Sequence, residues 1–165
     1  MPSQFRQITC LDRVGLVDSE RDRLQLYSEN RVRDFEEDPA EDTEIHERLG
    51  DADCCLVSWR TRLERRHLEA ASELRLVALC CSLYDESSSN VDMVAARDLG
   101  IEILGVRDYG DEGVVEFVLA ELIALVKGLR EDRQWRDEPW ELGAMSLGVL
   151  GMGRTGSMAT SPIRP

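Results

Sequence analysis

The segment Leu74–Cys81, with the sequence LRLVALCC, limits the possible folds of this chain more than any other segment. Apolar residues occupy nearly every position, so the segment cannot present one apolar and one polar face. A strand of this kind is buried on both faces, which is typical of a parallel sheet covered by helices on both sides. The segment therefore predicts an α/β protein.

Shorter apolar segments of strand length precede and follow this strand. They lie at residues 7–11, 32–35, 54–58 and 101–104. Helices are predicted between them, and their start signals are Ser19-x-x-Asp22, Asp38-Pro39, Thr61-x-x-Glu64 and Ser89-x-x-Asp92. Gly50 and Gly100 are expected to end two of the helices. Strand and helix alternate about five times, which predicts a doubly wound parallel sheet of about five strands.

The pattern changes after Val106. Residues 114–129 predict one long apolar helix that carries Glu116 and Glu121, and residues 131–141 form a charged linker with Pro139. The segment SLGVL at 146–150 predicts a new strand that leads directly into a glycine-rich turn.

This turn, Gly151-x-Gly153-x-x-Gly156, matches the dinucleotide-binding fingerprint. The first glycine would make a tight turn, the second would admit the pyrophosphate, and the third would allow close packing of the helix. Backbone N–H groups of Arg154 and Thr155 would then face the phosphates. The alternative is an ordinary glycine-rich turn.

The residues after the turn do not complete a nucleotide site. Pro162 and Pro165 end the predicted helix early, and no acidic residue follows about 20 positions later to bind a ribose. We therefore expect weak or absent dinucleotide binding by this chain alone.

The composition disfavours several classes of partner. Thirty-three acidic and 20 basic residues give a net charge of -13, which repels nucleic acid and anionic membranes. No apolar run is long enough to span a bilayer, and the first residues do not resemble a signal peptide. The five cysteines form no CxxC pair, which favours a cytoplasmic protein without a metal site.

Several segments, in order, resemble one family, the D-isomer-specific 2-hydroxyacid dehydrogenases. They are DADCCLVSWRTRLERRHLEAASELRLVALC, NVDMVAARDLGIEILGV, GVVEFVLAELIAL and SLGVLGMGRTG. The resemblance covers about two thirds of the chain, from Asp51 to Gly156, and Val114-Val115-Glu116 stands where the family usually has Val-Ala-Glu.

The resemblance implies a domain organisation and an activity. Residues 1–108 would form a flavodoxin-like substrate domain, residues 109–143 an interdomain helix and linker, and residues 144–165 the truncated start of a Rossmann NAD-binding domain. The implied activity is hydride transfer between NAD or NADP and a 2-hydroxy or 2-keto acid. The implied cofactor-binding residues are Gly151, Gly153, Arg154, Thr155 and Gly156.

The resemblance also implies a substrate cleft. Backbone amides in the loop Ser82-Leu83-Tyr84-Asp85 would bind the substrate carboxylate, although this loop is longer than the family's glycine-rich form. Arg60 and Tyr109 would face the same cleft. The alternatives are a surface charge for Arg60, a helix-entry contact for Tyr109, and a packing role for Trp59 beside Arg60.

No catalytic residue is expected within the chain. The family's substrate-gripping Arg and its His with an acidic partner belong to the cofactor domain beyond Pro165. His46 and His67 are expected to be surface residues of helices. Glu116 is expected to organise the long helix.

Three interpretations follow. The first is a truncated dehydrogenase, from a frameshift or a premature stop. The second is a non-enzymatic module that binds a small acid or a protein and self-associates through Val114–Leu129. The third and weakest is a receiver-type signalling domain, which the lack of an acidic cluster near Ser58 or Cys81 disfavours.

Overall fold

A computed structural model describes residues 4–107, 109–130 and 133–160 and divides into two compact units, residues 1–107 and residues 108–165. Unit 1 contains five strands: β1 (Ile8–Cys10), β2 (Arg33–Asp34), β3 (Cys54–Val57), β4 (Leu76–Ser82) and β5 (Glu102–Val106). All of them are parallel, in the order β2-β1-β3-β4-β5. This is the flavodoxin-like strand order, and it confirms the predicted fold class.

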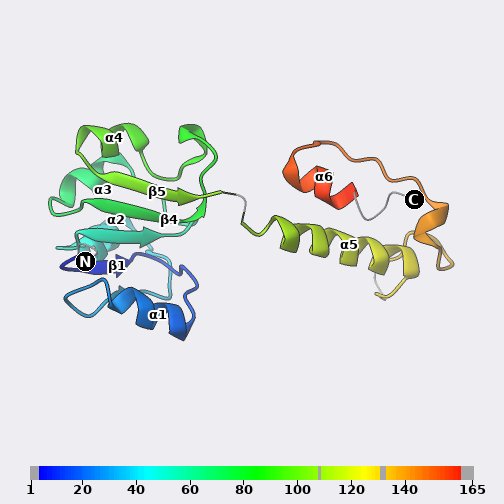
Figure 1. Ribbon diagram of the computed structural model, residues 1–165, viewed down its shortest axis with the longest axis horizontal. Helices are drawn as coiled ribbons and strands as arrows, with labels where there is room; N and C mark the ends of the chain where they lie inside the picture. Colours follow the sequence, from blue (N-terminus) through cyan, green and yellow to red (C-terminus); the bar gives the residue numbers. More distant parts are fainter. Residues whose placement is uncertain (1–3, 108, 131–132, 161–165) are drawn as a thin grey trace. The chain divides into compact units, whose positions relative to one another are not determined.

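Helices follow the strands in unit 1, as Figure 1 shows. They are α1 (Asp18–Gln25), α2 (Asp42–Leu49), α3 (Arg65–Ala70), the 3-10 turn η1 (Glu86–Ser88) and α4 (Met93–Asp98). Unit 2 contains α5 (Asp111–Lys127), the 3-10 turn η2 (Leu142–Ala144) and α6 (Arg154–Thr160). None of the helices described is both long enough and apolar enough to cross a bilayer.

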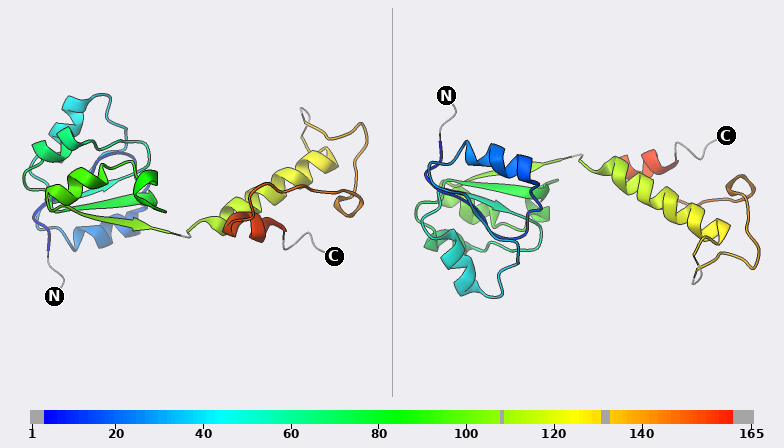
Figure 2. Two further views of the ribbon diagram at one scale, coloured as in Figure 1. Left: turned by 90° about the horizontal axis from the view of Figure 1, so that it is seen from above. Right: turned by 90° about the horizontal axis from the view of Figure 1, so that it is seen from below.

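Side chains of β3 alternate between two apolar layers because successive residues of a strand point to opposite faces. Cys55 and Val57 pack in the layer that includes residues of α2, α3 and α4, whereas Cys54 and Leu56 pack in the layer that includes Leu24 of α1. Figure 2 shows α1 (blue) on the opposite side of the strands from α2 (cyan) and α3. This two-sided burial explains why the predicted central strands are apolar at nearly every position.

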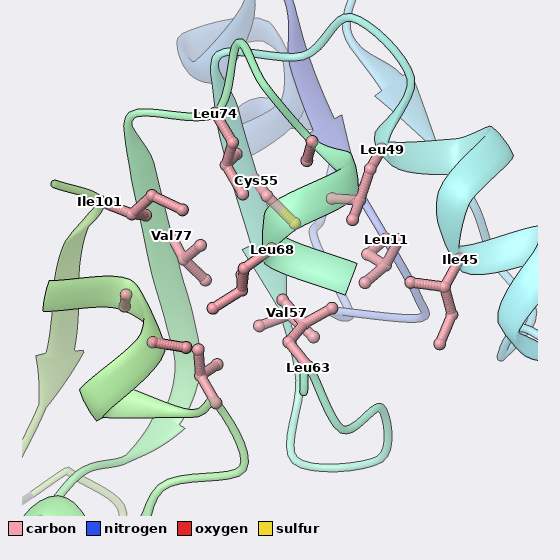
Figure 3. Close-up of a cluster of buried hydrophobic side chains, with 14 of the residues drawn as sticks. Leu11, Ile45, Leu49, Cys55, Val57, Leu63, Leu68, Leu74, Val77 and Ile101 are labelled. Atoms are coloured by element: carbon pink, nitrogen blue, oxygen red, sulfur yellow. The ribbon is translucent and has the colours of Figure 1, made fainter. Parts of the chain in front are cut away.

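The larger apolar layer forms the main core of unit 1, which Figure 3 shows. Leu63 and Leu68 reach it from the loop before α3 and from α3, and both are almost completely buried. Ala95 and Ala96 line it from α4, whereas Val94 on the same helix is exposed.

All four predicted helix start signals were wrong, because each helix begins at another residue. Helix α2 follows Glu41 rather than Asp38-Pro39. Helix α3 has Glu64 rather than Thr61 at its N-cap. The segment before it is extended instead, since Leu63 forms a bridge with Val91. Asp92 rather than Ser89 caps α4, where its carboxylate accepts a hydrogen bond from Ala95 N at 2.8 Å. Helix α1 follows Val17 without a side-chain cap.

The predicted strand at 146–150 was also wrong, because these residues form no strand in the structure. A strand requires a hydrogen-bonded neighbour, and none of the described residues of unit 2 forms a strand that could pair with this segment. Its apolar side chains Leu147 and Leu150 are half exposed and fully exposed. The prolines at 162 and 165, which were predicted to end the last helix, lie outside the described residues.

Asp53 joins the amino-terminal ends of three strands. Its carboxylate accepts hydrogen bonds from the backbone N–H groups of Arg6 and Gln7, both at 3.0 Å, and from the Arg75 guanidinium at 2.8 Å. Burial raises the pKa of Asp53, but these donors lower it by more, so the pKa lies below its ordinary value. The ionised carboxylate therefore stabilises the start of the sheet.

We predict that Asp53→Asn lowers the free energy of unfolding at pH 7 by about 1–3 kcal/mol, because an amide supplies one acceptor where two backbone N–H groups need one each. The contribution of Asp53 is fully present above the unfolded-state pKa of about 4 and is lost as the pH falls through the lower folded-state pKa. Urea titrations at several pH values should therefore give curves for the wild type and the variant that converge in acid.

Asp51→Asn is the matched control, because Asp51 is exposed and its carboxylate pairs with the guanidinium of Arg33 on the surface. Its effect should stay within about 1 kcal/mol. An Asp53→Asn effect no larger than that of Asp51→Asn would contradict the role given to Asp53.

Candidate functional site

Polar residues gather where β1 and β3 end, at the carboxyl edge of the sheet. Asp12 is completely buried, and its carboxylate accepts hydrogen bonds from Ser58 N at 2.8 Å and from Ser58 Oγ at 2.9 Å. Ser58 Oγ in turn accepts a hydrogen bond from Arg60 N at 3.2 Å. Asp12 and Ser58 thus fix the backbone from which the side chain of Arg60 projects.

Asn90 closes this network from the loop before α4. Its side-chain amide donates hydrogen bonds to the backbone carbonyls of Ser58 and Thr61. The sequence analysis did not identify Asp12, Ser58 or Asn90 as site residues. A usable signal was present for two of them, because Asp12 and Ser58 directly follow apolar strands, where open α/β sheets place their ligands.

Arg60 lies at this edge of the sheet, but its guanidinium already has partners. It donates a hydrogen bond to the Arg13 carbonyl at 3.1 Å and lies 3.7 Å from the carboxylate of Asp38. It also lies over the ring of Trp59, 5.1 Å from the ring centroid. Trp59 is largely exposed, which argues against a packing role for that side chain.

The predicted residues Leu83 and Tyr84 lie in the loop after β4, whereas Ser82, also predicted for this loop, is the last residue of β4 and pairs with Val106 of β5. Leu83 N donates to the Val106 carbonyl at 3.0 Å, and Tyr84 N donates to Ser88 Oγ at 3.2 Å. Asp85 N also donates to Ser88 Oγ, at 3.1 Å, so the backbone N–H groups of Leu83, Tyr84 and Asp85 are all used within the protein. A methyl group on Gly105 would lie 2.4 Å from Leu83 Cβ, so Gly105 leaves the space that the Leu83 side chain occupies.

The predicted cleft residues line separate hollows. Arg60 lines a hollow of about 240 Å³ beside α2 and α3, and Leu83 lines one of about 600 Å³ beside β5 and η1. Tyr109 belongs to unit 2 and is half exposed. Within unit 1, the structure thus brings Arg60 to the same edge of the sheet as the loop after β4 without direct contact between them.

The glycine turn in unit 2 has three glycines in different situations. Gly151 has a φ of +92°, which favours glycine. A methyl group on Gly156 would lie 2.0 Å from the Gly151 carbonyl oxygen, whereas a methyl group on Gly153 would meet nothing within 4 Å. The third glycine therefore allows the helix to pack against the turn, and the second leaves its backbone open, as the fingerprint requires.

Helix α6 begins within this turn, directly after Gly153, and lies against α5, as Figure 1 shows. The two predicted side chains at its start contact Asp111, the first residue of α5. Thr155 Oγ1 donates to Asp111 Oδ1 at 2.9 Å, and Arg154 Nε lies 2.8 Å from Asp111 Oδ2. Asp111, which the sequence analysis did not single out, thus joins the glycine turn to the long helix.

His67 is a buried structural residue, so its prediction as a surface residue was wrong. Its side chain is 2% exposed, and Nδ1 accepts a hydrogen bond from Glu64 N at 3.0 Å. Nε2 lies 3.2 Å from Asp42 Oδ1. His67 therefore completes the N-terminal cap of α3, in a position where glutamate or glutamine is the usual signal. The ring of His46 packs against it, with the centroids 5.3 Å apart.

The cysteines are unsuited to nucleophilic or metal-binding roles. All five are free thiols. Burial raises the pKa of Cys54 to about 12 and that of Cys80 to about 11, and it also raises the pKa of Cys10 and Cys55. Thiolates are the reactive form and the metal ligand, so these groups stay protonated at neutral pH. Among the described residues, no group of three or more His, Cys, Asp or Glu side chains could hold a metal ion.

Curated relatives are enzymes that act on small hydroxy or keto acids. The chain is 25% identical over 146 residues to a hydroxypyruvate reductase from Blautia hydrogenotrophica, covering 79% of this chain and 42% of that protein. It is 28% identical over 135 residues to a glyoxylate reductase from Korarchaeum cryptofilum, covering 74% and 40%. The chain thus spans about two fifths of the length of these two relatives.

A solved structure of similar fold is the NAD+-bound 3-phosphoglycerate dehydrogenase from Entamoeba histolytica. It superimposes with a TM-score of 0.69 at 18% identity, covering 98% of this chain and 51% of that one. The family described as D-isomer specific 2-hydroxyacid dehydrogenase, catalytic domain, matches residues 14–161. This match covers most of the chain and confirms the resemblance, and the chain therefore belongs to the D-isomer specific 2-hydroxyacid dehydrogenase family.

Proposed function

We propose that this chain is part of an oxidoreductase that transfers a hydride between NAD or NADP and a small 2-hydroxy or 2-keto acid. The observation that carries the proposal is the glycine turn at 151–156, whose three glycines have the distinct environments that a pyrophosphate-binding turn needs. The family match through residue 161 supports the same activity.

The proposed division of labour follows the two compact units. Residues 1–108 would bind the substrate, residues 109–143 would form the helix and linker between domains, and residues 144–165 would begin the cofactor domain. The boundary between the compact units, after Arg107, supports the first division.

The proposed cofactor-binding residues are Gly151, Gly153, Arg154, Thr155 and Gly156. When bound, the dinucleotide would accept or donate the hydride. The open backbone at Gly153 would admit its pyrophosphate, and Arg154 and Thr155 would offer donors at the start of α6. Because these residues can reach only the phosphates, we propose that this chain binds the dinucleotide weakly.

The proposed substrate-cleft residues are Arg60, Ser82, Leu83, Tyr84 and Tyr109. Arg60 supplies the positive charge that a substrate carboxylate requires, and Asp12 and Ser58 position its backbone. Since Leu83 N and Tyr84 N donate within the protein, the loop after β4 would form a wall of the cleft rather than bind the carboxylate through these amides.

We propose that no residue of this chain transfers the substrate proton. Such a step uses a side chain within hydrogen-bond reach of the substrate. His67 is buried in the cap of α3, and His46 packs against it, so neither histidine is available for this role.

A reducing, cytoplasmic environment is proposed from the five free thiols, several of them in the core. The net charge of -13 disfavours binding to nucleic acid and to anionic membranes.

We predict that NADH binds the full chain with a dissociation constant of about 1 mM or weaker. A constant of this size corresponds to a binding free energy of roughly -4 kcal/mol. Gly153→Ala should weaken this binding by at least about tenfold, because a methyl group would occupy the space left for the pyrophosphate. Ligand-observed NMR titration measures both values. Gly143→Ala is the control, since a methyl group there also meets nothing within 4 Å; equal binding by all three proteins would contradict the proposed site.

We also predict that the chain alone catalyses no NAD-dependent oxidation of D-lactate or D-glycerate, because neither histidine can reach a substrate. The measurement is the absorbance of the reduced nicotinamide over hours at millimolar substrate. A steady rise that scales with protein concentration would show that this chain contains a complete active centre.

A second candidate function is a non-enzymatic interaction module, and the exposed face of α5 favours it. Val114, Phe117 and Val118, which share one side of the helix, are between 41% and 66% exposed. Phe117 also lines an apolar hollow of about 360 Å³ together with Leu147. An exposed apolar face of this extent favours association with another protein or with a second copy of the chain.

We predict that the chain self-associates through this face and that Phe117→Ser shifts the equilibrium towards monomer. Sedimentation velocity at several concentrations measures the shift. Leu26→Ser is the matched control, because Leu26 is equally exposed but belongs to unit 1. A wild-type chain that stays monomeric at all concentrations would exclude this association.

A further inference from the structure

The carboxylate of Asp111 contacts two polar side chains within the glycine turn, those of Arg154 and Thr155. Its side chain is only 9% exposed. Oδ1 accepts the hydrogen bond from Thr155 Oγ1 at 2.9 Å, and Oδ2 lies 2.8 Å from Arg154 Nε. Two side-chain donors that a phosphate could use at the start of α6 are therefore already engaged by an anion of the chain itself.

This carboxylate is not fully satisfied where it lies. Oδ2 is buried and has no aligned hydrogen-bond donor, although it is close to the Arg154 guanidinium. A buried charged oxygen without a hydrogen bond is destabilising. The carboxylate of Asp111 is therefore held by one hydrogen bond, from Thr155, and by the charge of Arg154.

An arginine and a hydroxyl that bind a carboxylate can equally bind a phosphate, since both ligands are oxygen anions that accept charge-assisted hydrogen bonds. Two anions cannot use the same donors at full strength, and they also repel each other across the few ångströms between them. A phosphate at the glycine turn would therefore have to compete with Asp111.

We propose that Asp111 is an internal anion that competes with the pyrophosphate group of a dinucleotide for Arg154 and Thr155 and so weakens its binding. This inference rests on the proposed function, because it takes the glycine turn as the pyrophosphate site. Asp111 acts through Arg154 and Thr155 and is a positioning residue.

An anchoring role for Asp111 predicts the opposite change in phosphate affinity. If Asp111 only anchors α6 to α5, its replacement loosens the turn and weakens the binding of any phosphate ligand. The direction of the change in affinity therefore separates competition from anchoring.

The test compares the wild-type chain with Asp111→Asn, which keeps one acceptor for Thr155 and removes the charge. The probes are NADH and inorganic pyrophosphate, each titrated by ligand-observed NMR at low and at high salt. We expect Asp111→Asn to bind both probes about fivefold or more tightly at low salt, and the gain to shrink at high salt as charges are screened.

Glu112→Gln is the matched control. Glu112 lies in the same turn of α5, carries the same charge and is exposed, so its replacement should change the affinity by less than about twofold. A second check uses Arg154→Gln, in whose background Asp111→Asn should give little gain.

The outcomes separate this inference from the proposed function. Unchanged or weaker binding of both probes by Asp111→Asn overturns the inference, and it leaves the proposed function intact if the wild type binds NADH. Tighter binding of pyrophosphate alone, with no NADH binding by any variant, supports the inference and overturns the proposed cofactor. If no variant binds either probe, the inference and the proposed function both fail. Hydrogen exchange of residues 154–160 shows whether Asp111→Asn still forms α6.

Discussion

Burial of β3 and β4 between helices on both faces is the constraint on which unit 1 depends. Backbone N–H groups next to such strands cannot reach water, so they need partners within the protein. Two buried carboxylates, at opposite edges of the sheet, accept hydrogen bonds from some of these N–H groups. Asp53 takes the N–H groups of Arg6 and Gln7 at the amino edge, and Asp12 takes that of Ser58 at the carboxyl edge. The second of these contacts fixes the backbone of the proposed substrate side.

Much of the fold could be predicted because it depends on local patterns. The apolar run at 74–81 indicated a central parallel strand, and β4 lies there. Positions that depend on distant residues could not be predicted in the same way. Helix α3 begins three residues later than the signal at Thr61, because Leu63 pairs with Val91 from another loop. The segment 146–150 has a strand pattern but forms no strand, because pairing requires a neighbour that the pattern cannot supply.

The candidate site, too, could be predicted where it depends on local sequence and could not be predicted where it depends on distant residues. The glycine turn was found from its spacing and from a strand predicted before it; the strand does not form, but the environment of the turn agrees with the role of each glycine. Asp111 was not found, because its role depends on side chains more than 40 residues away in the sequence. The backbone amides of Leu83 and Tyr84 could not be assessed either, since whether an amide is free depends on its neighbours after folding.

The environments of Gly153 and Gly156 have a consequence for the evolution of sequences that share this turn. Any side chain at 156 collides with the chain's own Gly151 carbonyl, so folding alone would preserve glycine there even after a protein had stopped using a nucleotide. A methyl group at 153 meets nothing within 4 Å. Folding therefore does not require glycine at that position, and a related sequence could replace it there without a collision at Cβ once it no longer used a nucleotide.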